Sequence, residues 1–364
     1  MKSKRLFTGV IYLATFVMSI IYLPGCADRD VNSKMKNGTE ISDLVLIYHG
    51  STHRPDWNVN EMRPYIFRNE GGDFHWLFDG FLFLEIFDRI ERYEWDPGFG
   101  YTTASREQWE WLLDRYFGES KGPDALESIL DSLSKQGKKP LRPRRVVFSI
   151  PCPVSGFTDW GEINGKIMDF NKPEDQIAAA CWFTDRVLEK WEEKGYKHIH
   201  LDGFYWVHEA AGKDFAIIPE VKEYIKKKEM RLYWIPYWNA ERADQWALLG
   251  FDCAYQQPNY FFNKDIPYQR LDDACIFGKQ HDMGMEMEFD NNVVNPEIHG
   301  RFYDYISAFE THGVWSERKV AYYEGGGAWM KMSQSDDPEM EKMVAKLAEI
   351  IKDRQEKADR EHMK

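Results

Sequence analysis

The residues best suited to chemistry lie in the stretch 284–290, where acidic and apolar side chains alternate. On a strand with this pattern, Glu286, Glu288 and Asp290 share one face, and two methionines and a phenylalanine share the other. Carboxylates cannot pack against an apolar layer without partners, because removing each charge from water costs several kcal/mol. We therefore expect the acidic face to line a polar site. The alternative is a structural network of these acids with arginines or lysines.

A second acidic region occurs earlier in the chain, where Asp202 ends a strand-like run and Glu209 follows in the next loop. Two carboxyl groups that face each other across a cleft are what cleavage of a glycosidic bond requires. One is protonated and assists the leaving oxygen, and the other is ionised and attacks the sugar or activates water. We expect one of Asp202 and Glu209 to pair with Glu288, and Glu286 and Asp290 to orient Glu288 and the substrate.

Strand-like and helix-like runs alternate along the chain from residue 43. The strand-like runs cover 44–48, 79–85, 145–151, 198–206, 232–238, 252–260, 284–290 and 319–324. The segment after the first run is predicted to be a loop, and a short helix that carries Trp246 is predicted after the fifth. Eight such runs followed by helices predict an α/β fold, a single (β/α)8 TIM barrel. An open doubly wound sheet is the alternative, but no glycine-rich nucleotide loop follows the first strand.

In such a barrel the chemistry is built at the C-terminal ends of the strands. The ends of the other runs are acidic, amide-bearing and aromatic, and we expect them to bind substrate. They are Glu85, Trp206, Tyr237, Trp238, Gln257, Asn259, Tyr260 and Glu324. Flat rings can stack on sugars, although packing beneath the loops is the alternative for each ring.

Composition narrows the range of partners. The formal net charge of the 364 residues is −13 and no basic patch is evident, which argues against nucleic acid. Aromatic residues make up 15% of the chain, which suits a large core and a ring-lined cleft. Apart from Cys26, the four cysteines show neither CxxC nor zinc-ligand spacing, so we expect buried free thiols, no metal site and no cofactor.

The N-terminus is typical of export. A basic start is followed by an apolar run, 6–23, which ends at Gly25 and Cys26. This pattern predicts a lipoprotein signal over 1–25, with lipid on Cys26, and a polar tether over 26–42. An ordinary signal peptide or an uncleaved anchor is the alternative. The barrel is predicted over 43–335 and a charged C-terminal helix over 336–364. The localisation that follows is the bacterial outer membrane, on its surface or its periplasmic face.

Several blocks of the sequence resemble an uncharacterised bacterial family, domain of unknown function 4855, whose barrel is similar to glycoside hydrolases. The blocks are 201–206 with Glu209, 234–238, 257–260 and 286–290. The resemblance covers 44–329 and implies an exported glycan-degrading system, with possible partners in glycan uptake. In the wider superfamily of barrel glycosidases, the acid/base lies on strand four and the nucleophile on strand seven. By similarity these positions are Asp202 or Glu209, and Glu286 or Glu288. The chain lacks the Asn-Glu pair that many of those enzymes carry on strand four.

Three functional hypotheses follow. The first is a lipid-anchored glycoside hydrolase that acts on a poly- or oligosaccharide. The second is a non-catalytic glycan-binding lipoprotein on the same scaffold, which would need the aromatic rings but not the paired acids. The third is a metal-dependent hydrolase or a calcium-stabilised barrel, with Glu288 and Asp290 as oxygen ligands.

Overall fold

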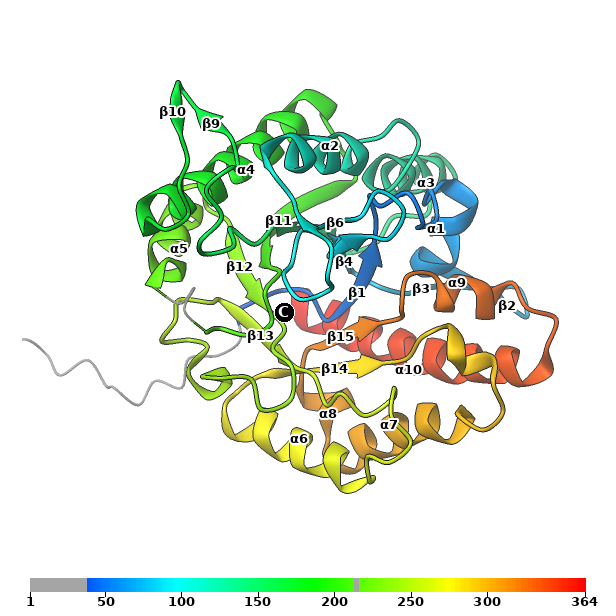
Figure 1. Ribbon diagram of the computed structural model, residues 1–364. Coiled ribbons are helices and arrows are strands. Elements are labelled where there is room, and N and C mark those ends of the chain that lie inside the picture. Colours follow the sequence, from blue (N-terminus) through cyan, green and yellow to red (C-terminus); the bar gives the residue numbers. More distant parts are fainter. Residues whose placement is uncertain (1–37, 213–215) are drawn as a thin grey trace, which may run out of the picture. The chain divides into compact units, whose positions relative to one another are not determined.

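Eight parallel strands close into a barrel, and this confirms the predicted fold (Figure 1). The computed structural model describes residues 38–212 and 216–364; the predicted signal segment, Cys26 and most of the tether lie outside them. Neighbours around the barrel follow the chain order, and the last strand pairs with the first. The strands are β1 (Asp43–Tyr48), β4 (Gly80–Leu84), β8 (Arg144–Ile150), β11 (Ile199–Trp206), β12 (Arg231–Trp234), β13 (Cys253–Gln256), β14 (Gly284–Glu288) and β15 (Val320–Tyr323).

Helices surround the strands (Figure 1). They are α1 (Val59–Ile66), α2 (Arg106–Tyr116), α3 (Pro123–Lys135), α4 (Pro173–Lys194), α5 (Ile218–Lys227), α6 (Gln269–Gln280), α7 (His299–Thr311), α8 (Val314–Glu317), α9 (Ala328–Ser333) and α10 (Pro338–His362). Short hairpins and strands decorate the loops: β2 (Phe67–Glu70), β3 (Asp73–Trp76), β5 (Phe87–Asp88), β6 (Tyr93–Glu94), β7 (Thr102–Thr103), β9 (Glu162–Ile163) and β10 (Lys166–Ile167). Within the described ranges, no helix combines the length and apolar character needed to cross a membrane.

Two connections differ from the predicted pattern. The segment after β1, expected to be a loop, contains α1, whose first turn is fixed by a capping box between Asn58 and Glu61. Pro64 lies within this helix and interrupts its pattern, so the periodicity of the sequence does not indicate a helix here. The connection between β12 and β13 holds only a 3-10 turn, η2 (Ala243–Gln245), where we expected a short helix.

The core has two layers, on the two sides of the barrel wall. One cluster fills the barrel and includes Tyr48, Tyr205, Tyr233 and Tyr255. The other lies between the strands and the surrounding helices. Alternate residues of each strand belong to alternate layers, as the pleat of a strand requires.

Buried ion pairs tie α10 to the N-terminal ends of the strands. Arg354 of α10 donates to Asp43 at 2.6 Å, and Arg142 pairs with the buried Asp79. Asp79 also accepts from the amide of Asp43 at 2.8 Å. Desolvation alone would raise the pKa of Asp79, but its arginine neighbours and these amides hold the pKa below its usual range. This end of the barrel is therefore occupied by a structural polar network.

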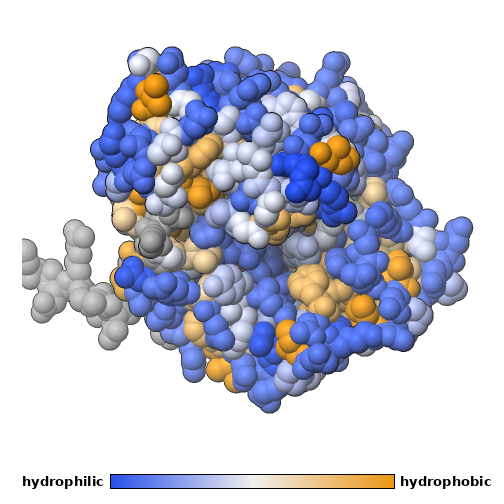
Figure 2. All heavy atoms as spheres, in the orientation of Figure 1, coloured by the Kyte–Doolittle hydropathy of each residue, from blue (hydrophilic) through white to orange (hydrophobic). Residues whose placement is uncertain are grey.

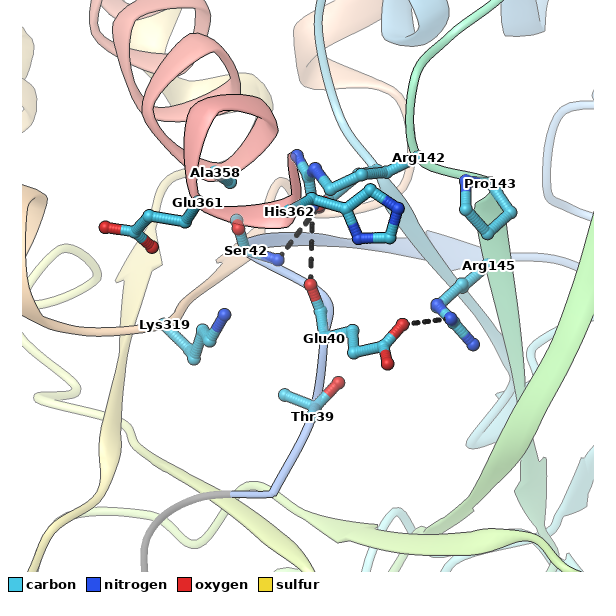
Figure 3. A pocket seen from close by; sticks show the side chains of 11 residues that line it. Thr39, Glu40, Ser42, Arg142, Pro143, Arg145, Lys319, Ala358, Glu361 and His362 are labelled. Atoms are coloured by element: carbon cyan, nitrogen blue, oxygen red, sulfur yellow. Dashed lines mark hydrogen bonds and ion pairs between the residues drawn. The ribbon is translucent and has the colours of Figure 1, made fainter. Parts of the chain in front are cut away.

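A pocket of about 230 Å³ opens at the same end of the barrel (Figure 3). Its arginines already have acidic partners, since Arg142 pairs with Asp79 and Arg145 pairs with Glu40 and Asp202. In barrels of this type, residues at the N-terminal ends of the strands support stability and residues at the C-terminal ends carry out chemistry. We therefore place the candidate site at the opposite end, on the face drawn in Figure 2, which is hollowed near its centre.

Candidate functional site at the C-terminal mouth of the barrel

Glu286 and Glu288 lie on the inner face of β14, as the alternation predicts. Both side chains are buried, with 1% of each residue exposed. Met285 and Met287 belong to the outer core layer and pack toward the helices. Glu288 is the last residue of the strand, so it stands at the C-terminal mouth, with Glu286 one step deeper in the barrel.

Glu288 is held from two sides. Asn259 Nδ2 donates to its Oε1 at 3.2 Å, and the Tyr305 hydroxyl of α7 donates to its Oε2. Burial raises the pKa of Glu288 to about 7, against the opposing effect of these donors and of the backbone amides of Asn259 and Tyr260. Hydrogen bonds that favour the ionised form are what a nucleophile or a general base needs.

A chain of amide side chains links Glu288 to Glu209. Asn259 Nδ2 also donates to Gln257 Oε1 at 2.9 Å, and Gln257 Nε2 donates to the carbonyl of Ile235 at 2.8 Å. The Gln257 side chain also lies close enough to the Glu209 carboxyl to favour its ionised form. Asn259 adopts a left-handed backbone, φ 49°, and its Oδ1 accepts from the amide of Trp238 at 2.7 Å. Gln257 and Asn259, expected to bind substrate, thus connect the two carboxyl groups.

The surroundings of Glu209, Glu286 and Glu288 raise the pKa of each carboxyl to a different extent. Glu209 is half-buried in the loop after β11. Burial raises its pKa to about 8, and the nearby carboxyls of Asp96 and Glu288 act in the same direction. Burial also raises the pKa of Glu286, with Glu288 and Glu209 as the acidic neighbours that add to the effect. A carboxyl that remains protonated near neutral pH can serve as a general acid.

Asp202 does not end its strand, contrary to our expectation. β11 continues to Trp206, and its register shifts between Leu201 and Gly203. The buried Asp202 accepts at 2.8 Å from both Arg145 and Arg231, which stand at the N-terminal ends of neighbouring strands. The structure does not bring Asp202 together with Glu288, so Glu209 is the partner that remains from the strand-four region.

Glu85 and Glu324 are also committed to partners within the chain. Glu85 receives two hydrogen bonds from Arg54, at 2.9 and 3.0 Å. Glu324 accepts from the amide of Gly327 at 2.7 Å and from the amide of Trp329 at 3.0 Å, and burial raises its pKa to about 7. The expectation that these two acids bind substrate is not supported, because they organise loops instead.

Two of the expected sugar platforms are buried. Trp206 has 1% of its surface exposed and belongs to the outer core layer. Tyr260 is 3% exposed, donates to Asp304 at 2.6 Å and lies beneath the guanidinium of Arg301. Strand alternation explains the error for Trp206, because Tyr205 is the neighbour that faces the barrel interior.

Other rings remain available near the mouth. Tyr237 is 39% exposed, and Trp238 is half-buried with the guanidinium of Arg270 5.2 Å from the centre of its ring. Phe262, which we did not expect in the site, is 49% exposed and packs edge-on against Tyr323, with ring centres 5.5 Å apart. Its place two residues after Tyr260 is the signal that could have found it.

Asp290 shapes the loop after β14. It caps the 3-10 turn η3 (Asn291–Val294), and its Oδ1 accepts from the amide of Asn292 at 2.8 Å. The oxygens that the calcium hypothesis would use on Glu288 and Asp290 are thus already hydrogen-bonded within the chain.

One group of side chains at the mouth has a composition that could hold a metal ion. One ligand atom from each of Asp96, Cys152 and His208 lies within 4.8 Å of the others. These residues follow three successive barrel strands, which sequence spacing could not reveal. His208 Nδ1 and Asp96 Oδ1 are 2.7 Å apart, a hydrogen-bonding distance, and we interpret this contact as orienting the loop that carries Glu209.

The residues 43–349 match the family described as "Domain of unknown function (DUF4855)". The chain belongs to this family. The match covers the barrel and about the first half of α10, and it confirms the resemblance that the sequence blocks suggest. The DUF4855 description assigns no reaction, so the site carries the functional argument. No curated protein matches the chain.

Solved structures with similar chain paths share little sequence with this DUF4855 protein. The tryptophan synthase A-subunit from Pyrococcus furiosus is 12% identical, covering 86% of this chain and 98% of its own, with a TM-score of 0.40. Tryptophan synthase subunit alpha from Legionella pneumophila str. Paris is 9% identical, covering 87% of this chain and 93% of its own, also with a TM-score of 0.40.

Proposed function

We propose that this protein is a glycoside hydrolase that cleaves a poly- or oligosaccharide with Glu209 as the general acid and Glu288 as the nucleophile or base. One observation carries the proposal: Asn259 hydrogen-bonds both Glu288 and Gln257 at the barrel mouth, and Gln257 lies beside Glu209. Their environments differ in the required sense, since Glu288 has more donors that favour its ionised form.

The roles follow from charge. Ionised Glu288 approaches the anomeric carbon, or the water that attacks it, while Tyr305 and Asn259 fix its two oxygens. Protonated Glu209 gives its proton to the leaving oxygen, which would otherwise depart as an unstable alkoxide. Tyr237, Trp238 and Phe262 supply rings around the mouth on which sugar units stack.

Digestion of a panel of polysaccharides by the purified chain tests this proposal. New reducing ends should appear with at least one glycan and should form far more slowly when Glu209 or Glu288 is replaced by glutamine. Binding of a glycan without any cleavage would instead support the non-catalytic glycan-binding protein.

The pH dependence of kcat/KM should be bell-shaped, with its maximum between pH 7 and 8. Activity should rise as Glu288, pKa about 7, ionises, and fall as Glu209, pKa about 8, loses its proton. The two apparent values belong to the interacting set of acids, so each limb reports the pair. Glu209→Gln should remove the alkaline limb, and Glu241→Gln, a control on an exposed loop, should leave the profile unchanged. A flat profile would contradict these roles.

The proposal includes export and a lipid anchor on Cys26, which would hold the enzyme at the bacterial outer membrane near partners in glycan uptake. Cys26→Ala should move the protein from the membrane fraction to the soluble fraction. If the variant remains membrane-bound after washing, the apolar run 6–23 is the anchor instead. Protease treatment of intact cells would distinguish the cell surface from the periplasmic face.

A further inference from the structure

The mouth contains one carboxyl more than the proposed reaction uses. Glu286 lies on the same inner face as Glu288, one alternation deeper, and 1% of the residue is exposed. Its Oε1 is buried without a hydrogen-bond partner among the described residues. An unsatisfied buried acceptor is costly, so such a group beside the barrel mouth indicates a donor that arrives with the ligand.

The charged side chains around Glu286 also share one sign. The charged neighbours that act most on Glu286 are both acids, Glu288 and Glu209. Within residues 38–212 and 216–364, no lysine or arginine forms an ion pair with any of these three carboxyls. Arg54 is close to the mouth, but its guanidinium is already paired with Glu85 at 2.9 Å. Among the described residues, therefore, no lysine or arginine balances these three carboxyls, and a cation that arrives with a ligand would favour their ionised forms.

We propose that Glu286 receives a protonated amine and that the substrate is a glycan built from amino sugars with free amino groups. This inference rests on the proposed function of the same site. An ammonium group brings three donors and a positive charge, so one donor can satisfy Glu286 Oε1 while the charge balances the cluster. A neutral hydroxyl can satisfy the oxygen but not the charge, and N-acetylation removes the charge from the amine.

The net charge of the whole chain acts in the same direction. At −13, the protein attracts a polycationic glycan at long range and repels polyuronates and sulfated polymers. This long-range attraction is screened by salt, whereas a contact buried at Glu286 is screened much less. The two contributions can therefore be separated by ionic strength.

The test compares glucosamine oligosaccharides with their fully N-acetylated counterparts of equal length, with galactosamine oligosaccharides as a second pair. Binding to the full chain carrying Glu288→Gln is measured by calorimetry, so that cleavage does not interfere. We expect the free-amine form to bind at least about tenfold more tightly, as loss of a buried charge contact produces. Part of this preference should persist at high salt.

Matched variants test whether the preference for the free amine arises at Glu286. Glu286→Gln, added to Glu288→Gln, should abolish the preference for the amine at high salt, because glutamine keeps the shape but not the charge. Glu241→Gln makes the same chemical change on an exposed loop and should retain it. Glu286→Met serves as a second neutral variant if the glutamine variant does not fold, and thermal melting checks each protein.

The outcomes separate this inference from the function on which it rests. Equal affinity for both forms, or no binding of the amine forms, overturns the inference. Cleavage of neutral glycans with amino-sugar glycans left intact also overturns it, while the glycoside hydrolase proposal stands. Selective binding of the amine forms with no cleavage of any glycan by the unmodified chain supports the inference and overturns the hydrolase.

Discussion

Replacing Glu288 with glutamine is expected to lower turnover by roughly 10³-fold or more while the barrel stays folded. Glutamine has almost the same shape and keeps a side-chain oxygen that can accept from Tyr305 or Asn259. It cannot ionise, so it can neither attack the anomeric carbon nor take a proton from water. The measurement is the initial rate of reducing-end release from a glycan that the unmodified chain cleaves.

Glu288→Gln should not lower the thermal stability of the fold, although it lowers activity. The pKa of Glu288 in the folded chain, about 7, lies above the usual value of a glutamate, so its protonated form stabilises the fold at acid pH. That contribution is lost as the pH rises through 7, and the ionised side chain then carries the cost of its burial. Glu288→Gln should therefore melt no lower than the unmodified protein at pH 8.

Two results would contradict the role of Glu288. Full activity in Glu288→Gln would remove it from the chemistry and return the advantage to the glycan-binding protein. A variant that loses activity because it unfolds would assign Glu288 to the structure. Glu241→Gln, the same change at an exposed position, is the matched control for both measurements.

The sequence predicted the barrel because its strands are short apolar runs and its helices show clear periodicity. The alternation in 284–290 also identified the inner face of β14 correctly, since Met285 and Met287 can be buried against helices and the acids cannot. Both predictions depend only on local features of the sequence, namely apolar runs and the spacing of apolar and acidic residues. The missed helix α1 is the exception, because Pro64 breaks its pattern.

The contacts between distant segments could not be predicted in the same way. The rule that polar strand ends line the mouth identifies a position along the chain but not the direction of the side chain. Trp206 and Glu324 follow or end their strands and still point into the outer layer or a loop. Tyr305 lies on α7 and contacts Glu288, and nothing in a helical pattern indicates such a contact.

Asp202 and Glu209 show most directly what the sequence could not predict, because both remained candidates for the general acid. The choice depends on partners that lie 29 and 57 residues from Asp202, at the starts of two neighbouring strands. Glu209, in contrast, lies beside Gln257, and hydrogen bonds of Asn259 connect Gln257 to Glu288.

The second large effect is expected for Asp202→Asn, which should lower the free energy of unfolding by about 2–3 kcal/mol. The 2% exposed carboxylate neutralises Arg145 and Arg231, each at 2.8 Å, and accepts from the Tyr233 hydroxyl. Asparagine fills the space but leaves both guanidinium groups without their counter-charge. The loss stays below that of a fully buried pair because the arginine side chains are 19% and 32% exposed.

Denaturant unfolding measures this loss, and Glu110→Gln gives the matched control. Glu110 forms a surface pair with Arg106 at 3.0 Å, so its replacement should cost less than about 0.5 kcal/mol. The folded fraction of Asp202→Asn should keep its turnover and the bell-shaped pH profile, whereas Glu209→Gln should lose the alkaline limb without a comparable loss of stability. A stable Asp202→Asn variant with an altered pH profile would instead make Asp202 the acid, and the roles of the two strand-four carboxyls would exchange.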